Sequence, residues 1–180
     1  MRNILGKAIE YAGAPISDHK FISGYNDAVH DLCMMYDTAK ARDTEVITCV
    51  DTEAFYPLAA GCLKIERVRT SGGAYFSFYE VRSGQIRFGL RDTYTLHELF
   101  MQEAITDMDD DITIDPAYIK AIAGYIAAKA IKKADPERSK ELMLQYAVDA
   151  DYANKTYGRQ LTRTSAYMRP DSDKEALLWQ

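Results

Sequence analysis

Residues 115–136 read DPAYIKAIAGYIAAKAIKKADP, and this stretch marks the start of two helices. In each Asp-Pro pair, Asp115-Pro116 and Asp135-Pro136, the carboxylate can cap a helix whose first residue is the proline. Between the pairs, isoleucine and alanine recur at steps of three and four residues, which predicts a helix over about 116–134. Its alanines would let a neighbouring helix approach closely.

The helix that begins at Pro136 is predicted to span about 136–157 and to end at Gly158. Its apolar residues form one stripe, made of Leu142, Tyr146, Ala150, Ala153 and Tyr157. Because the connection to the preceding helix is very short, the two helices should form an antiparallel hairpin. Beyond Gly158 the periodicity stops, and residues 159–180 are predicted to be an extended C-terminal tail.

Two further helices are predicted in the N-terminal part of the chain. The first spans about 2–12 and is stopped by Gly13 and Pro15. The second spans about 18–40, where apolar residues recur at helical steps from Phe21 to Tyr36. The longer helix carries the clearest amphipathic pattern of this half.

Between the two helical regions, the apolar period changes to two, which is typical of strands. Ser71-Gly72-Gly73 and Ser83-Gly84 supply turns between them. Residues 45–101 therefore predict one β insertion of about four or five strands. The predicted fold class is α+β, mainly helical: a helix bundle with an inserted small antiparallel β unit and an extended C-terminal tail. Residues 1–158 are expected to form a single domain.

Composition places the chain among ordinary globular proteins. Apolar residues make up 47% of its 180 residues and charged residues 27%. The formal charge of −5 argues against a protein that binds nucleic acid through contacts with the phosphate backbone. Cys33, Cys49 and Cys62 match neither a disulfide framework nor a zinc site. No secretory signal and no membrane span are predicted.

No motif of the sequence predicts a catalytic, cofactor-binding or metal site. The acidic stretch 107–115 resembles a calcium loop but has Ile112 where glycine is needed and Tyr118 where glutamate should close the loop. The three histidines are not at ligand spacing, and Ser71-Gly72-Gly73 lacks the ending of a phosphate loop. Asp51 and Glu53 are read as a polar strand end rather than a catalytic pair.

Basic residues recur along the predicted strands, with acidic residues between them. A mixed-charge solvated sheet face would explain this pattern. The sharper hypothesis is a row of ion pairs between subunits, formed by Arg67, Arg69, Arg87 and Arg91.

The order of elements, together with several short motifs, resembles the head-to-tail adaptor (connector) family of tailed bacteriophages, which includes the tail tubular A proteins. The similar segments cover nearly the whole chain, although their patterns are degenerate. They are Tyr56-Pro57-Leu58 before the strand Leu63 to Val68, Tyr79-Glu80-Val81 with Gly84-Gln85-Ile86 as a central hairpin, Asp115-Pro116-Ala117-Tyr118, and Leu142 to Tyr157.

This resemblance implies a non-enzymatic structural protein of the virion, assembled in the bacterial host cytoplasm. It implies a ring of about twelve copies beneath the portal protein, with DNA passing through the channel without sequence-specific binding. The opposite face would receive a tail or neck protein, a nozzle or stopper. The C-terminal residues would dock onto the portal, and the candidate contacts are Leu161, Tyr167, Met168, Arg169, Leu177, Leu178 and Trp179. A frayed terminus would equally explain the absence of periodicity there.

Two other functions remain open from the sequence. A soluble DNA-binding or regulatory module would need a concentrated basic face. A small enzyme with a non-motif active site would need a deep pocket lined by perturbed carboxylates or by His97.

Overall fold

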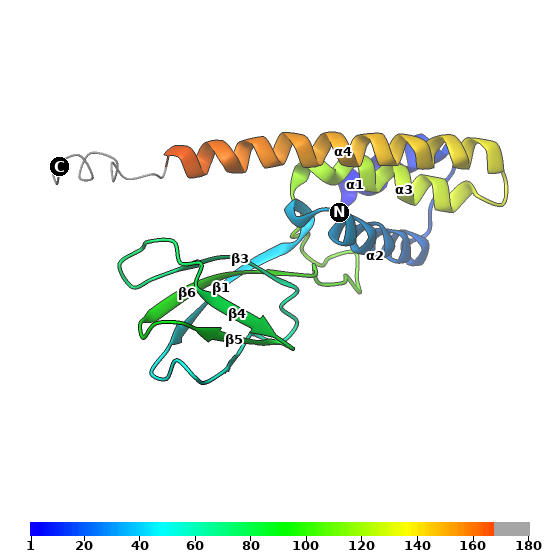
Figure 1. The fold of residues 1–180 in the computed structure, drawn as a ribbon. Coiled ribbons are helices and arrows are strands. Elements are labelled where there is room, and N and C mark those ends of the chain that lie inside the picture. Colours follow the sequence, from blue (N-terminus) through cyan, green and yellow to red (C-terminus); the bar gives the residue numbers. More distant parts are fainter. Residues whose placement is uncertain (168–180) are drawn as a thin grey trace. The chain divides into compact units, whose positions relative to one another are not determined.

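The computed structural model describes the backbone of residues 1–167 and the side chains of residues 1–157. Two compact units make up the chain (Figure 1). The helical unit holds Met1–Leu32 and the chain from Ile105 onward, and the β unit holds Cys33–Ala104. The β unit is thus an insertion between the second and third helices.

The helical unit is built around α3 (Ile119–Ile131), which packs against both α1 (Arg2–Ala12) and α4 (Pro136–Tyr167). In α2 (Asp18–Met35), Gly24 lies against α3, because a Cβ at this position would be 3.3 Å from Ile126 Cγ1. Burial of α3 on several sides requires small side chains that let the neighbouring backbones approach. Its buried residues are Ala121, Ile122, Ala123, Gly124, Ile126, Ala127, Ala128 and Ile131.

Both predicted Asp-Pro caps are confirmed. Asp115 Oδ1 accepts the backbone N–H of Ala117 at 2.8 Å, and Asp135 Oδ1 accepts that of Arg138 at 3.1 Å. The first cap opens a single 3₁₀ turn, Pro116–Tyr118, before α3 begins at Ile119. The predicted hairpin is also present: Ser139 Oγ donates to the carbonyl of Ala128 at 2.8 Å, joining α4 to α3.

Helix α4 is longer than predicted, because it continues through Gly158 to Tyr167. A glycine inside a helix costs about 1 kcal/mol relative to alanine, which is too little to stop a helix that is otherwise favourable. With 32 residues, α4 runs well past the start of α3, which has 13 (Figure 1). The prediction of an extended tail from residue 159 is therefore wrong for residues 159–167.

The β unit contains two antiparallel sheets of three strands each. The large sheet has the order β1-β6-β3, formed by Ala41–Thr48, Thr93–Phe100 and Lys64–Arg69. The small sheet has the order β2-β5-β4, formed by Tyr56–Pro57, Gln85–Phe88 and Tyr79–Arg82. A tight turn joins β4 to β5, where Ser83 and Gly84 both have positive φ, as expected for the predicted hairpin.

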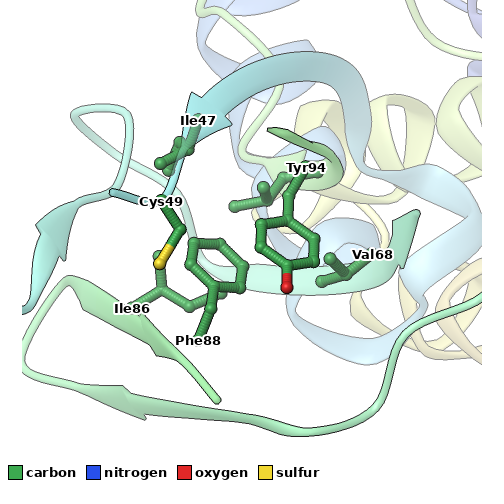
Figure 2. Packing of buried hydrophobic residues seen from close by; sticks show 7 residues of the cluster. Ile47, Cys49, Val68, Ile86, Phe88 and Tyr94 are labelled. Carbon is green, nitrogen blue, oxygen red and sulfur yellow. The ribbon is translucent and has the colours of Figure 1, made fainter. Parts of the chain in front are cut away.

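A single apolar cluster is shared by the two sheets (Figure 2). Phe88 of the small sheet stacks on Tyr94 of the large sheet, with ring centroids 4.0 Å apart and the rings 8° from parallel. Around this pair lie Ile47, Cys49, Val68, Ile86 and Leu96. The inner faces of both sheets are therefore committed to the core, and their outer faces remain for solvent or partners.

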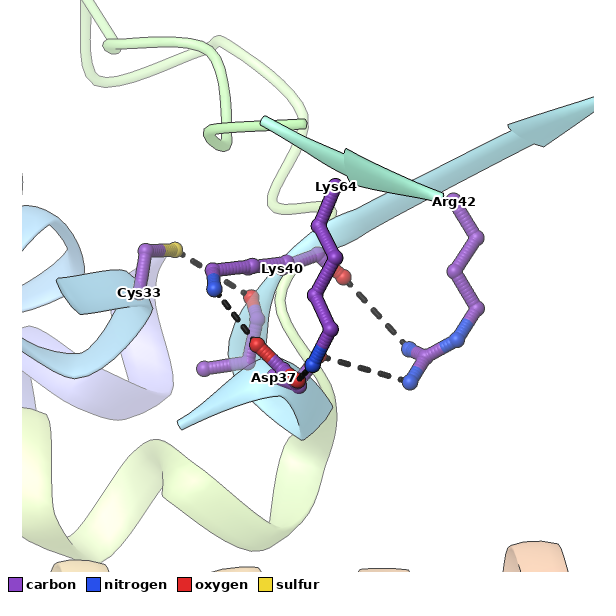
Figure 3. Close-up of polar contacts among 6 residues, drawn as sticks. Cys33, Asp37, Lys40, Arg42 and Lys64 are labelled. Carbon is purple, nitrogen blue, oxygen red and sulfur yellow. Dashed lines mark hydrogen bonds and ion pairs between the residues drawn. The ribbon is translucent and has the colours of Figure 1, made fainter. Parts of the chain in front are cut away.

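Chain entry into the β unit differs from the predicted helix over 18–40. Helix α2 ends at Met35, a 3₁₀ turn covers Asp37–Ala39, and β1 starts at Ala41. Lys40 and Lys64 both form ion pairs with the Asp37 carboxylate, and Arg42 Nη2 donates to the Asp37 carbonyl at 3.4 Å (Figure 3). These contacts hold a turn where helical periodicity alone would continue the helix.

The predicted fold class is wrong. Helices hold 45% of the residues and strands 21%, so the chain is not a mainly helical bundle with a minor insertion. Two sheets replace the single β unit, because β2, β4 and β5 pair with one another and not with β1, β3 and β6.

Close packing around α3 leads to a test with a matched control. Ala127 is fully buried, whereas Ala147 on α4 is exposed. We expect Ala127→Leu to lower the free energy of unfolding by about 1–3 kcal/mol, because the added atoms force neighbouring helices apart. Ala147→Leu should change it little. Urea unfolding followed by helical circular dichroism measures both, and equal effects of the two substitutions would contradict the packing described.

Candidate interaction surfaces

The outer face of the large sheet carries a group of basic side chains. Residues opposite one another in antiparallel strands share a face, and His97 of β6 is opposite both Thr44 of β1 and Arg67 of β3. Arg69 lies opposite Thr95, in the next row of the same face. This face points away from the core cluster, whose β6 residues are the alternate ones, Tyr94 and Leu96.

A β-bulge in β3 brings Arg67 to this outer face. The register shifts between Ile65, which is opposite Glu98, and Arg67, which is opposite His97. Strict alternation from Ile65 would turn Arg67 inward and Val68 outward. The extra residue, Glu66, reverses that order, so Val68 is buried and Arg67 faces outward beside Glu66.

We call this outer groove the arginine groove. It has a volume of about 190 Å³ and is lined by Arg42, Asp43, Thr44, Glu66, Arg67 and His97. Glu66 Oε2 lies 3.6 Å from both Arg42 Nε and Arg67 Nη2, so two cations share one carboxylate. Beside the groove, Arg69 Nη2 donates to Tyr75 Oη at 3.5 Å, and its guanidinium lies 5.2 Å from the centre of the Tyr75 ring.

Arg67 and Arg69 act on the pKa values of two neighbouring groups, His97 and Tyr75. Burial lowers the pKa of His97, and the nearby Arg67 and Arg69 lower that pKa further. Hydrogen bonds from Arg69 and Arg67 lower the pKa of the Tyr75 hydroxyl, because they stabilise its anionic form. Burial is the largest cause of the lowered His97 pKa, and Glu66 acts in the opposite direction, so the two arginines account for only part of that shift.

The four arginines predicted to form one row lie in different places. Arg67 and Arg69 are together on the large sheet. Arg87 lies on β5 of the small sheet, where it pairs with Glu80 at 2.6 Å and packs 5.2 Å from the centre of the Phe55 ring. Arg91 is exposed in the connection between β5 and β6. Strand alternation alone could not predict that Arg87 lies apart from Arg67 and Arg69. This separation arises because β5 pairs with β4 and not with a strand of the large sheet.

A second candidate surface is an apolar ridge on α4, made of Leu144, Val148 and Tyr152. These side chains are 72%, 62% and 71% exposed, respectively. At four-residue steps they follow one line about 12 Å long, opposite the buried series Tyr146, Ala150 and Ala153. The ridge was not predicted from the sequence, although Leu144, Val148 and Tyr152 have the four-residue spacing of a helix face and lie beside the predicted core stripe.

The C-terminal candidate residues can be placed only in part. Leu161 and Tyr167 belong to the described backbone of α4. Met168, Arg169, Leu177, Leu178 and Trp179 lie outside the described residues.

Glu98 is a buried carboxyl on the core side of the large sheet, with 1% exposure. Its Oε1 has no hydrogen-bond partner among the described residues. Burial raises the pKa of Glu98, the Cys62 thiol lowers it through a hydrogen bond, and nearby Glu45 and Asp43 raise it. In turn, burial and Glu98 raise the pKa of Cys62 to about 11, so this thiol is a poor nucleophile near neutral pH.

Within the described residues, no cluster of three or more histidine, cysteine or acidic side chains is arranged to hold a metal ion. His97 and Glu98 are neighbours on β6 but point to opposite faces, so they do not share a pocket. Over the part of the chain that the structure describes, no helix is long and apolar enough to cross a membrane.

Sequence comparison with known proteins gives no match from which a function could be inferred. No family model matches the sequence. A search of curated proteins finds no match either.

The buried Glu98 gives a pH-dependent stability prediction. Its pKa is raised by folding, so the native state holds the proton more tightly than the unfolded chain. Ionisation of the buried carboxyl therefore costs no stability below the unfolded pKa of about 4.3. The cost grows as pH rises above that value and is complete above the folded pKa. We expect Glu98→Gln to increase the free energy of unfolding at pH 7 by about 1 kcal/mol.

Urea titrations at pH 7 and pH 4 measure this effect, and the gain should shrink at the lower pH. The exposed Glu53→Gln serves as a control and should show no such difference. A gain from Glu98→Gln that is the same at both pH values would contradict the assignment of a strained buried carboxylate.

Proposed function

We propose that this protein is a structural virion subunit, a head-to-tail adaptor that forms a ring beneath the portal of a tailed bacteriophage. In this role it bridges capsid and tail and lines the DNA exit channel. Its work is done by contacts between surfaces rather than by chemistry at a site.

The observation that carries the proposal is the ridge of Leu144, Val148 and Tyr152 on α4. Large apolar side chains in the middle of the solvent face of a helix are unfavourable in an isolated subunit, and aligned groups of them mark contact surfaces. Glu141 precedes the ridge and Lys155 follows it, both exposed. Opposite charges at its two ends would fix the register of a neighbouring copy.

Several segments that carry the family resemblance support the same proposal. Tyr79-Glu80-Val81 and Gly84-Gln85-Ile86 form the β4-β5 hairpin, as the resemblance implies. Asp115-Pro116-Ala117-Tyr118 opens the most buried helix, and Leu142 to Tyr157 lies within the last one.

The partners in this proposal are the portal protein, a tail or neck protein such as a nozzle or stopper, and other copies of the chain, about twelve per ring. DNA passes through the ring without sequence-specific recognition. The residues proposed to bind the portal are those named from Leu161 to Trp179 in the C-terminal part of the sequence. The protein would accordingly be located in the virion, after assembly in the host cytoplasm.

Portal binding is tested by co-sedimentation with the purified portal ring encoded in the same genome. A chain truncated after Tyr167 removes residues 168–180 without cutting α4. We expect the full chain to co-sediment and the truncated chain to lose at least tenfold in affinity, because Leu177, Leu178 and Trp179 are removed. Circular dichroism and thermal unfolding of the truncated chain provide the folding control. Equal binding by both chains would refute the portal role of this segment, and no binding by either would refute the adaptor function.

Self-association is tested with Val148→Lys at the middle of the ridge. The substitution places a charge in an apolar contact, so we expect ring formation on the portal to be lost while the monomer remains folded. Ala147→Lys introduces the same charge at the adjacent exposed position and should leave assembly nearly unchanged. Light scattering of the protein with and without portal rings gives the subunit number. Rings of unchanged size from Val148→Lys would show that α4 does not form the subunit contact.

A further inference from the structure

The outer face at and beside the arginine groove carries three arginines, Arg42, Arg67 and Arg69, around one carboxylate, Glu66. Asp43 also lines the groove, but its position in β1 is opposite Glu98, which lies on the core side of the sheet. Arg42 and Arg67 share the Glu66 carboxylate, each at 3.6 Å, a distance at the long end for an ion pair. Arg69 Nη2 donates to the Tyr75 hydroxyl rather than to a carboxylate, and Arg69 Nε is buried without a partner among the described residues. Within the described part of the chain, the Arg69 guanidinium has no carboxylate partner, and its Nη2 group, whose contact with Tyr75 Oη is 3.5 Å long, can donate to an anion instead.

The groove is also partly shielded from water. The Arg42, Glu66 and Arg67 side chains are 28%, 31% and 33% exposed, respectively. Charges at such positions interact more strongly with an incoming ion than fully solvated ones do. Because the bulge at Glu66 decides which residues of β3 face outward, Arg67 and Arg69 are on the outer face before any ligand arrives.

We propose that the arginine groove binds phosphate groups of a nucleic-acid backbone, with Arg67 in the groove and Arg69 beside it as the direct donors. This is a non-sequence-specific contact with duplex DNA. All six residues that line the groove are polar or charged. Interfaces with nucleic acid are polar and rich in positive charge, whereas the centre of a protein–protein interface is depleted of charge. An acidic protein surface is therefore the less favoured occupant.

This proposal goes beyond the adaptor function, since ring assembly requires no anion site. The two can fail separately. An adaptor whose ridge forms the ring could leave the groove empty, and a DNA-binding chain need not bind a portal.

The experiment is fluorescence anisotropy of a labelled DNA duplex at several salt concentrations. We expect weak binding by the full chain at low salt, with an affinity that falls as salt rises. Substituting Arg67 and Arg69 together with glutamine should lower the affinity about tenfold or more and reduce the salt slope by about two, as expected for two lost phosphate contacts.

The matched control is the double substitution Arg82→Gln and Arg87→Gln. It removes the same charge from the small sheet, where both arginines pair with Glu80. This variant should bind nearly as well as the unaltered chain. Glu66→Gln removes the carboxylate that competes for Arg42 and Arg67, so it should tighten binding about threefold. Thermal unfolding verifies that each variant is folded.

His97 provides an independent readout. The charged and titratable groups around it are Arg67, Arg69 and Glu66 on β3, Arg42 and Asp43 on β1, and Tyr75 beside them. A bound phosphate would offset the arginines and raise the pKa of His97, so binding should tighten as pH falls from about 7.5 to 6. His97→Gln should remove most of this pH dependence. NMR titration of the histidine signal with duplex DNA measures the shift directly.

Three outcomes would overturn the proposal. The first is no binding of duplex DNA at low salt. The second is an equal loss of affinity in the Arg82/Arg87 and Arg67/Arg69 variants, which would indicate diffuse attraction. The third is displacement of DNA by poly-glutamate at the same charge concentration, which would assign the groove to an acidic protein surface. Competition by inorganic phosphate only at much higher concentration than DNA would support the nucleic-acid assignment.

Discussion

Each unit depends on one central element that neighbours cover on more than one side. In the helical unit this element is α3, whose buried residues include four alanines and a glycine, so adjacent backbones can approach it. In the β unit it is β6, which pairs with β1 on one edge and β3 on the other. An element enclosed in this way fixes the positions of its neighbours, and the exposed faces of those neighbours become the surfaces available for interaction.

Local signals in the sequence predicted much of the helical unit. The Asp-Pro caps and the helical period identified α3 and the start of α4 because these signals act over a few residues. The end of α4 was missed, since one glycine is a weak stop when the chain beyond it can remain helical. The end of α2 was missed for a different reason: Asp37 pairs with Lys64, which is distant in sequence and invisible to a periodic pattern.

The β unit was predicted less well, because strand pairing is non-local. Alternation identified most of the strands, but it contains no information on which strand pairs with which. The bulge that turns Arg67 outward could have been suspected from the three-residue spacing of Ile65 and Val68, which strict alternation does not allow. The separation of Arg87 from Arg67 and the burial of Glu98 required the three-dimensional structure, and so did the exposure of the α4 ridge.

The two ends of the β unit lie side by side. Ala41 at the start of β1 is opposite Phe100 at the end of β6, and Gln102 Nε2 donates to the carbonyl of Ala39 at 2.9 Å. An insertion whose two ends are adjacent in this way can be exchanged as a unit. A different module with similarly adjacent ends could replace it without altering the sequence of the helices on either side.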